Sequence, residues 1–305
     1  MRGAVAIAQR LNIPPVVVGL TIVAIGTSAP ELTVSIDAVL KGSPDIVTGN
    51  VVGSNLSNIL LVLGIAALIR PVQAAPQLIR RDGMMMVMSA ALLVGLAQTG
   101  EIGLITGICM LSLYVGYIGY CYWAEQVMGD PSQELTVADV EERSGEVQKL
   151  YVSVGMFLGG LAGVILGADL LVDGAVTLAR EFGLSEAVIA LSVVAIGTSL
   201  PELAVSVIAA CRGRSDVAVG NIVGSNISNV LFILGATSLV SPIDFATQII
   251  YFDSWVLMAV TILLIPVLVT GMSISRKEAV LFLSLYVLYI YAIFKGWPAA
   301  LIDLL

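Results

Sequence analysis

The strongest constraint on how this chain folds is a segment that it contains twice. Residues 26–58 begin GTSAPELTVS and end GNVVGSNLSN, and residues 197–229 begin GTSLPELAVS and end GNIVGSNISN. One constant offset aligns Glu31 with Glu202 and Asn50 with Asn221, and roughly half of the positions from 16 to 71 are identical to their counterparts. Self-similarity of this length is the signature of an internal repeat. The sequence therefore predicts two structurally equivalent halves.

The composition is that of a membrane protein. Hydrophobic residues make up 58 % of the 305 positions, charged residues make up 12 %, and the mean hydropathy is +1.00. A soluble domain has about twice that charged fraction. Apolar runs of about 20 residues, enough to cross a hydrocarbon core, recur along the chain. We expect an all-α polytopic membrane protein, with spans near residues 13–40, 44–69, 83–99, 102–123, 150–179, 184–211, 215–239, 249–270 and 277–296.

Residue usage excludes several kinds of chemistry. The chain has no histidine, so His-based proton relays, His-ligated zinc and Ser-His-Asp catalysis are excluded. Cys109, Cys121 and Cys211 form no CxxC pair and are typical of small core residues. An intramembrane protease would need an Asp–Asp or a Ser–His/Lys pair at membrane depth, whereas the matched pair in the GTSxPE motifs is Glu–Glu with oxygen neighbours. We expect no enzymatic activity, no cofactor and no nucleic-acid partner; a passive channel, recognisable by currents far above carrier turnover, is a further alternative.

The repeat divides the chain into a first half at 1–123, an acidic linker at 124–149 and a second half at 150–305. The alignment places residues 3–5 opposite residues 174–176, where a full helix at about 151–173 comes first. We therefore expect the first half to be truncated, with its first helix largely missing. The complete protein would have five spans in each half and ten in all.

An odd number of spans in each half places the two halves in opposite orientations. The distribution of Lys and Arg tests this, because cytoplasmic loops carry an excess of both. If the linker is cytoplasmic, the outside loops hold only Lys41, Arg180 and Lys295. The inside loops then hold Arg10, Arg70, Arg80, Arg81, Arg143, Lys149, Arg212, Arg214, Arg276 and Lys277. We expect inverted repeats in the cytoplasmic (inner) membrane.

The GTSxPE motif carries the first set of polar groups. Thr27 and Glu31 are four residues apart and would share one helix face. Pro30 removes a backbone donor, so the helix should break at membrane depth and free carbonyl groups near Ala24. The second copy repeats the device, with Ala195 supplying the matching carbonyl. Broken helices at equivalent positions of two halves point to the substrate site of a transporter.

The GNxxGSNxxN motif adds amide and hydroxyl oxygens. Ser54 and Asn58 share a helix face, and Gly49 and Gly53 have the spacing that lets a neighbouring helix approach closely. The second copy repeats these residues as Gly220, Gly224, Ser225 and Asn229. Asn55 and Asn226 are either structural hydrogen-bonding residues or ligands. All these groups offer oxygen, which favours hard cations such as Ca²⁺ and Na⁺.

The two duplicated glutamates are the leading functional candidates. An acid inside an apolar span is costly and is a functional-site hypothesis by default. Glu31 and Glu202 would repel each other in an empty site, and one Ca²⁺ would neutralise both, so competing cations or protons should exchange for one another. Asp82 and Asp253 also match across the copies, and we expect a helix-start or interface role for them.

At these residues the chain resembles the Ca²⁺/cation antiporter superfamily and, within it, the prokaryotic Na⁺/Ca²⁺ exchangers with their two α-repeats. The resemblance implies ten helices, with the α-repeats forming an ion-binding core between two longer, tilted helices that slide during alternating access. It implies a secondary active transporter that exchanges Na⁺ for Ca²⁺. The alternative is an H⁺-coupled antiporter of Ca²⁺ or another cation. Its partners would be these ions and the lipid bilayer, and it would work as a monomer.

Carried over position by position, the resemblance implies specific ligands. The calcium site would comprise Glu31 and Glu202 with Thr27 and Thr198. Sodium sites would use the same glutamates with Ser28, Ser199, Ser54, Ser225, Asn58, Asn229 and the carbonyls of Ala24 and Ala195. In some relatives an aspartate ends one GSNxxN motif, whereas both copies here end in asparagine. This lowers the charge of the site and argues against the K⁺-dependent branch.

Overall fold

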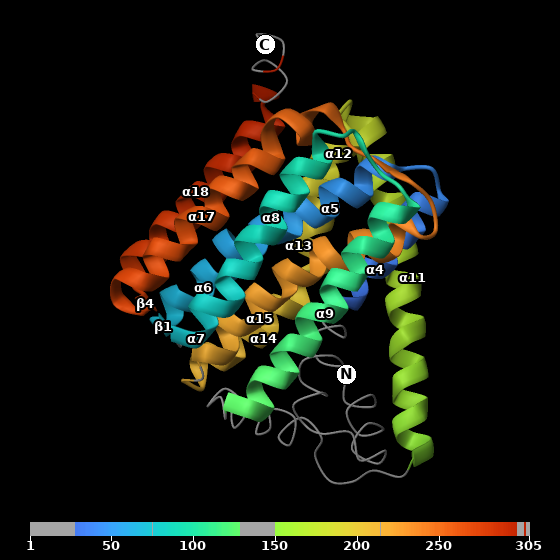
Figure 1. Cartoon of the computed structure of the whole chain (residues 1–305). Coiled ribbons are helices and arrows are strands. Elements are labelled where there is room, and N and C mark those ends of the chain that lie inside the picture. Colours follow the sequence, from blue (N-terminus) through green and yellow to red (C-terminus); the bar gives the residue numbers. More distant parts are fainter. Residues whose placement is uncertain (1–27, 75, 129–149, 214, 298–301, 303–305) are drawn as a thin grey trace.

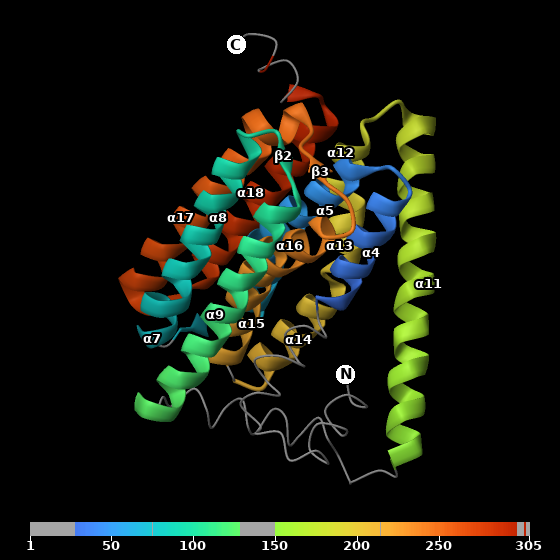
Figure 2. The same ribbon diagram turned by 45° about the vertical axis from the view of Figure 1, so that its right-hand side comes forward.

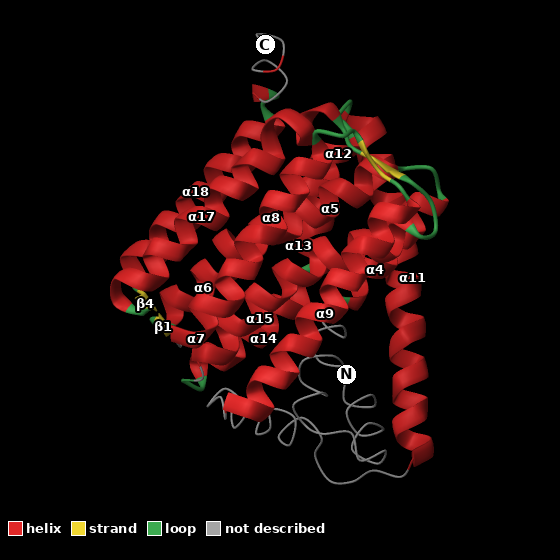
Figure 3. Cartoon of the chain, in the orientation of Figure 1, coloured by secondary structure: helices red, strands yellow, loops and turns green. Residues whose placement is uncertain are grey.

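The structure is a computed structural model that describes residues 28–74, 76–128, 150–213, 215–297 and 302. These residues form a helical bundle with two short strand pairs (Figures 1 and 3). The expected truncation of the first half and the acidic part of the linker concern residues outside this described part. The first half comprises α4 (Ala29–Leu40), α5 (Pro44–Leu56), η2 (Ser57–Val62), α6 (Leu63–Ile69), β1 (Val72–Gln73), α7 (Pro76–Leu78), η3 (Ile79–Gly83), α8 (Met84–Ala97), β2 (Glu101–Ile102) and α9 (Leu104–Met128).

The second half repeats this order from α14 onward, and four described elements, α11 to α13, come before it. It comprises α11 (Leu150–Phe182), α12 (Glu186–Ile189), η4 (Ala190–Val194), α13 (Ala195–Thr198), α14 (Leu200–Cys211), α15 (Ser215–Ser228), η5 (Asn229–Leu234), α16 (Gly235–Ser238), β3 (Ile243–Asp244), η6 (Ile249–Asp253), α17 (Ser254–Gly271), β4 (Ser273–Ile274) and α18 (Arg276–Phe294). The η segments are π-helical turns within longer helices. Such turns are rare and concentrate at functional sites.

Length and composition identify the membrane spans. Five described helices are long and apolar enough to cross a membrane, and a bent pair, Glu186–Thr198 with Leu200–Cys211, makes a sixth. The five are Pro44–Ile69, Leu104–Cys121, Val217–Ser238, Ile249–Val269 and Arg276–Phe294. The prediction of an all-α polytopic membrane protein is confirmed.

The two strand pairs join one half of the chain to the other. Val72 pairs with Ile274 in the antiparallel pair β1–β4, and Ile102 pairs with Ile243 in β2–β3. Figure 3 shows the two pairs in yellow at opposite ends of the bundle. Because β1 and β3 occupy equivalent places in the two copies, equivalent loops lie at opposite ends. This is the arrangement expected of inverted repeats.

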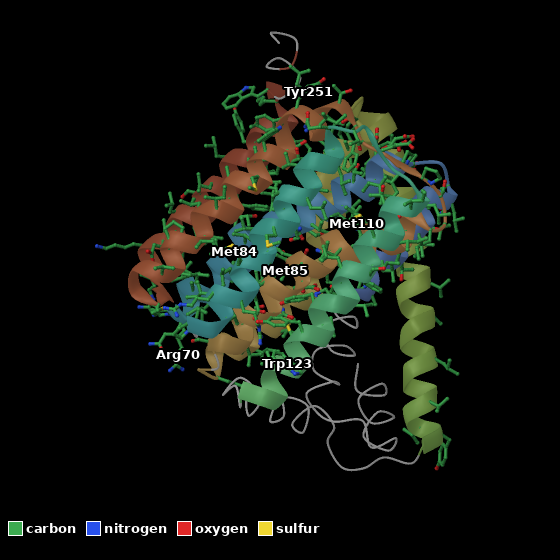
Figure 4. All side chains as sticks on the ribbon, viewed as in Figure 1. Arg70, Met84, Met85, Met110, Trp123 and Tyr251 are labelled. Carbon is green, nitrogen blue, oxygen red and sulfur yellow. The ribbon has the colours of Figure 1, made fainter. Side chains whose placement is uncertain are left out.

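Exposed aromatic side chains lie at both ends of the bundle, and two exposed arginines lie at one of these ends. Arg276 donates to the carbonyls of Leu68 and Ile69, at the end that carries β1 and β4. Figure 4 shows Arg70 and Trp123 toward this end and Tyr251 at the other. Exposed Trp and Tyr at both ends of a bundle are typical of the two membrane–water interfaces.

Helix α11 lies at the edge of the bundle (Figure 2). Its C-terminal half packs on the bundle through Val172, Ala175 and Ala179, which are buried. Lys41, at the end of α4, lies 2.8 Å from a carboxylate oxygen of Asp173 on α11. This ion pair is a charged contact between α11 and the end of the helix that carries Glu31.

Candidate cation-binding site

The site is built around the serine that precedes the glutamate helix of each GTSxPE motif, and in the second copy the helix breaks at this serine. In the second copy the axis bends by 47° between α13 and α14. Ser199 sits at the break with φ −80° and ψ 3°, and Pro201 lies in the first turn of α14. Ser28 has nearly the same backbone, φ −85° and ψ 7°, before α4 and its Pro30. The predicted break is confirmed in the second copy, while the residues before Ser28 lie outside the described part.

In both copies the glutamate lies in the first turn of its helix, inside the protein. Glu31 on α4 and Glu202 on α14 are both 0 % exposed. The positive end of the helix dipole lies at a helix N-terminus and stabilises a carboxylate there. The two carboxyl groups are also close enough to repel each other electrostatically. Two like charges buried together favour the binding of a cation between them.

Hydroxyl groups from both halves surround these carboxylates. Ser225 Oγ donates to Glu202 Oε1 at 3.5 Å, and Ser54 Oγ lies 3.2 Å from Thr198 Oγ1. The hydroxyls of Ser28 and Ser199 are buried and have no hydrogen-bond partner among the described residues. The two GTSxPE motifs and the two GSNxxN motifs therefore converge on one buried cluster of oxygens.

Asn50 and Asn221 belong to this cluster, although sequence reasoning did not single them out as site residues. Asn50 Nδ2 donates to the backbone carbonyl of Glu31 at 3.3 Å, and Asn221 Nδ2 donates to that of Glu202 at 3.4 Å. Each also donates to a serine on the same helix as its glutamate, Ser35 or Ser206. Both copies of the repeat have asparagine at this position, and this was the signal in the sequence that could have identified them as site residues. They fix the two glutamate helices against α5 and α15.

Asn55 and Asn226 hydrogen-bond across the two halves, as the structural one of the two roles left open for them requires. Asn226 Oδ1 accepts from Asn58 Nδ2 at 3.1 Å, and Asn55 Oδ1 accepts from Asn229 Nδ2 at 3.0 Å. Their amide oxygens are thus engaged within the protein. The Oδ1 atoms of Asn58 and Asn229 are buried and accept no hydrogen bond from the described residues.

One predicted carbonyl is not freed in the way the sequence suggested. The carbonyl of Ala195 accepts a hydrogen bond from the backbone N–H of Ser199 at 3.1 Å. The reason is that α13 stays helical as far as Thr198 and the break falls at Ser199, one turn later. Thr27 and Ala24 lie outside the described residues. The structure gathers the remaining candidates, which are Ser28, Glu31, Ser54, Asn58, Thr198, Ser199, Glu202, Ser225 and Asn229, in the buried interior.

Close helix packing brings the two halves together at this cluster. A Cβ atom added at Gly49 would lie 2.6 Å from Ala190 Cβ, and one added at Gly53 would lie 2.7 Å from Ala195 Cβ. Only glycine allows α5 to approach η4 and α13 this closely. The predicted GxxxG contact is therefore present in the first copy.

The donor set decides which ions the cluster suits. Within the described part of the chain no group of three or more His, Cys, Asp or Glu side chains gathers as a metal site. The cluster instead combines two carboxylates with neutral hydroxyl and amide oxygens. Hard cations such as Ca²⁺ and Na⁺ prefer such oxygen ligands, while zinc and copper favour thiolate or imidazole.

Asp82 and Asp253 occupy equivalent places away from this cluster but have different neighbours. Arg81 forms two hydrogen bonds to Asp82, at 2.7 and 3.0 Å, and Tyr117 donates a third at 2.8 Å. Asp253 is 0 % exposed and accepts from Tyr289 at 2.9 Å. The chain has Phe252 where the first copy has Arg81. Both aspartates contact the last helix of their half, as an interface role requires.

Comparisons with known proteins agree on one family. The family described as "Sodium/calcium exchanger protein" matches residues 1–123 and 152–295. The putative antiporter CaxA of Alkalimonas amylolytica is 38 % identical, with 96 % of this chain and 92 % of the relative covered. The sodium/calcium exchanger MaX1 of Methanosarcina acetivorans is 31 % identical, with coverages of 96 % and 93 %. Structures of the sodium-calcium exchanger NCX_Mj superpose with a TM-score of 0.66 at 31 % identity, covering 95 % of this chain and 90 % of that one.

Proposed function

This chain belongs to the sodium/calcium exchanger family, and we propose that it exchanges Na⁺ for Ca²⁺ across the membrane by alternating access. The observation that carries the proposal is the pair of buried glutamates, one from each half, in a cluster of hydroxyl and amide oxygens. Transported ions occupy such a cluster in turn, because an empty site leaves two carboxylates buried and repelling each other. Ca²⁺ and Na⁺ are therefore substrates, and the chain needs no cofactor.

The proposed ligands follow from the oxygens that the protein leaves available. Ca²⁺ binds between Glu31 and Glu202 with the hydroxyls of Thr27 and Thr198. Na⁺ uses the same glutamates with the oxygens of Ser28, Ser199, Ser54, Ser225, Asn58 and Asn229, and with the backbone carbonyls of Ala24 and Ala195. The Ala195 carbonyl would bind through the lone pair that its hydrogen bond from Ser199 leaves unused. The buried hydroxyls of Ser28 and Ser199 support this assignment, because an unsatisfied buried acceptor costs about 1–3 kcal/mol unless an ion or water pairs with it.

The charge of the site sets the electrical character of the exchange. Two carboxylates with one Ca²⁺ give a neutral complex, whereas two carboxylates with three Na⁺ leave one positive charge. An exchange of three Na⁺ for one Ca²⁺ would therefore respond to membrane voltage, at about 2.3 kcal/mol per elementary charge per 100 mV. The sodium gradient then drives Ca²⁺ out of the cell.

The arrangement in the membrane completes the proposal. We place the halves at residues 1–123 and 150–305 in opposite orientations, with the linker 124–149 on the cytoplasmic side of the inner membrane. The cations near β1 and β4, such as Arg70 and Arg276, support this side as the cytoplasmic one. The glutamates and their surrounding oxygens come from a single chain, which supports a functional monomer.

Uptake of ⁴⁵Ca²⁺ into proteoliposomes tests the proposal. An outward Na⁺ gradient should drive uptake by the protein, and Glu202→Gln should abolish it because the substitution removes one of the two site charges while keeping the shape. Glu101→Gln, an exposed acid on β2, is the matched control and should transport normally. Uptake driven by a proton gradient without sodium would favour the H⁺-coupled alternative, and normal transport by Glu202→Gln would remove the site assignment.

A further inference from the structure

Four asparagines are linked by hydrogen bonds between the two halves, with a reciprocal pair, Asn55 and Asn226, at the centre. Asn55 Nδ2 donates to the backbone carbonyl of Asn226 at 3.2 Å, and Asn226 Nδ2 donates to that of Asn55 at 3.3 Å. Asn58 Nδ2 and Asn229 Nδ2 donate to the side-chain oxygens of Asn226 and Asn55. All four residues are at most 2 % exposed. We call this set the asparagine ring.

The backbone carbonyls fix the direction of every bond in the ring. A backbone carbonyl can only accept a hydrogen bond, so the groups that Asn55 and Asn226 turn toward it must be their NH₂ groups. Their Oδ1 atoms consequently point the other way and can only accept. Asn58 and Asn229, which meet these oxygens, must then present their own NH₂ groups. No amide in the ring can rotate by half a turn without placing two donors or two acceptors together.

The outcome is a fixed orientation for the two amides that end the GSNxxN motifs. With their NH₂ groups held by the ring, Asn58 and Asn229 keep their Oδ1 atoms free, and both atoms are buried without a hydrogen-bond partner among the described residues. A buried acceptor of this kind is normally satisfied by a water, an ion or a protein donor. Both asparagines lie where the helix widens into a π-helical turn, at η2 and η5.

We propose that Asn55 and Asn226 are positioning residues that aim the Asn58 and Asn229 oxygens at the transported ions and thereby set the affinity for Na⁺. Each positions the asparagine of the opposite half: Asn226 holds Asn58, and Asn55 holds Asn229. The inference rests on the proposed function, since it requires these oxygens to meet cations. Asn55 and Asn226 act through the side chains that they hold, because the Nδ2 and the Oδ1 of each take part in hydrogen bonds of the ring.

The ring should affect Na⁺ more than Ca²⁺. A divalent ion between two carboxylates gains most of its binding energy from those charges, since Coulomb energy scales with the product of charges. Several monovalent ions share the same two carboxylates and depend more on neutral oxygens to complete their coordination. An amide that can turn its NH₂ group inward replaces an attractive oxygen with a repulsive donor, which weakens Na⁺ binding first.

A double-mutant cycle on purified protein tests the proposal through equilibrium ⁴⁵Ca²⁺ binding and its displacement by Na⁺. For Asn226→Ala we expect an increase of about tenfold in the Na⁺ concentration that displaces half of the Ca²⁺, the size of one lost charge-assisted interaction, with the Ca²⁺ affinity changed by less than about twofold. Asn58→Ala should give an effect of similar size. The double variant should be no worse than Asn58→Ala, because Asn226 acts on Na⁺ only through Asn58.

Controls separate positioning from loss of structure. Thr237→Val removes a fully buried hydroxyl outside the ring and should leave both ion affinities unchanged. Asn55→Ala with Asn229→Ala forms a second, independent cycle, which decides the question if Asn226→Ala does not fold. Additive effects within a cycle, or equal changes in Na⁺ and Ca²⁺ affinity, would overturn the positioning role. A wild-type protein whose bound Ca²⁺ is not displaced by Na⁺ would instead contradict the proposed function.

Discussion

The hydroxyl oxygens of Ser54 and Thr198, which belong to opposite halves, lie 3.2 Å apart and both donate to Asn50 Oδ1. Asn50 must present this oxygen, because its Nδ2 is held by the backbone carbonyl of Glu31. A hydroxyl has one proton, so when both protons point to Asn50 the lone pairs of both hydroxyls remain for another partner. In this arrangement two neutral hydroxyl oxygens near the two carboxylates have lone pairs available for a cation.

Removing the Thr198 hydroxyl should therefore weaken Ca²⁺ binding. We expect Thr198→Val, which keeps the shape of the side chain, to lower the apparent Ca²⁺ affinity by about tenfold, corresponding to one lost hydrogen-bond-like contact to a charge. Thr198→Ser keeps the hydroxyl and is the matched control. The concentration dependence of ⁴⁵Ca²⁺ uptake measures both variants. Equal affinities for Val and Ser at this position would show that the hydroxyl does not contact the ion.

Ion binding should stabilise the folded protein through the same carboxylates. At a Ca²⁺ concentration of 100 times the dissociation constant, the stabilisation is about 2.7 kcal/mol. A thermal-unfolding measurement in detergent should show the midpoint rising with added Ca²⁺ and falling when a chelator removes it. Glu31→Gln should lose most of this dependence, while Glu101→Gln should keep it. A Ca²⁺-dependent midpoint that survives Glu31→Gln would place the stabilising ion elsewhere.

Gly53 should tolerate no larger residue. A Cβ atom there would lie 2.7 Å from Ala195 Cβ and 2.7 Å from the backbone oxygen of Leu191, and neither can move without shifting the broken helix. We expect Gly53→Ala to destabilise the protein by about 1–3 kcal/mol and to impair transport, since overpacking displaces the helix backbone. Gly95→Ala, at an exposed position of α8 with no described atom within 4 Å of the new Cβ, is the control. It should be neutral or slightly stabilising.

The two matched aspartates should differ in importance. Asp82 receives two bonds from the Arg81 guanidinium, and the side chains of Arg81 and Asp82 are only 18 % and 12 % exposed. Asp82→Asn leaves a largely buried guanidinium facing an amide, which we expect to cost about 2 kcal/mol, below the range for fully buried pairs. Asp253→Asn keeps an oxygen that accepts from Tyr289 and should cost little. Thermal unfolding compares them, and equal losses would show that the Arg81 ion pair contributes nothing.

Most of this architecture could be predicted from the sequence, because the repeat contains both doubled polar motifs and apolar spans. The doubled motifs identified the glutamates, and the apolar spans placed them at membrane depth. Span ends were also close, as with 44–69, which matches α5 to α6. The periodicity of the motifs located the helix break within one turn, but it could not show that the backbone N–H of Ser199 would donate to the Ala195 carbonyl.

Two features of the site required three-dimensional information. The roles of Asn50 and Asn221 depend on which backbone carbonyl their amides meet, 19 residues away along the chain. The choice between ligand and hydrogen-bonding roles for Asn55 and Asn226 depends on contacts between halves, 171 positions apart. Neither separation corresponds to a helical or strand period, so no local pattern reveals these contacts.

The strand pairs β1–β4 and β2–β3 limit how the protein can open. In each pair a strand of one half is hydrogen-bonded to a strand of the other, and the two pairs, called clasps below, lie at opposite ends of the bundle. Two bodies fastened together at both ends cannot rock against each other like the jaws of a clamp. We therefore expect a passage to either side of the membrane to be uncovered by an element outside both strand pairs. Among the described helices, α11 meets that condition, because it lies at the edge of the bundle and neither clasp includes it.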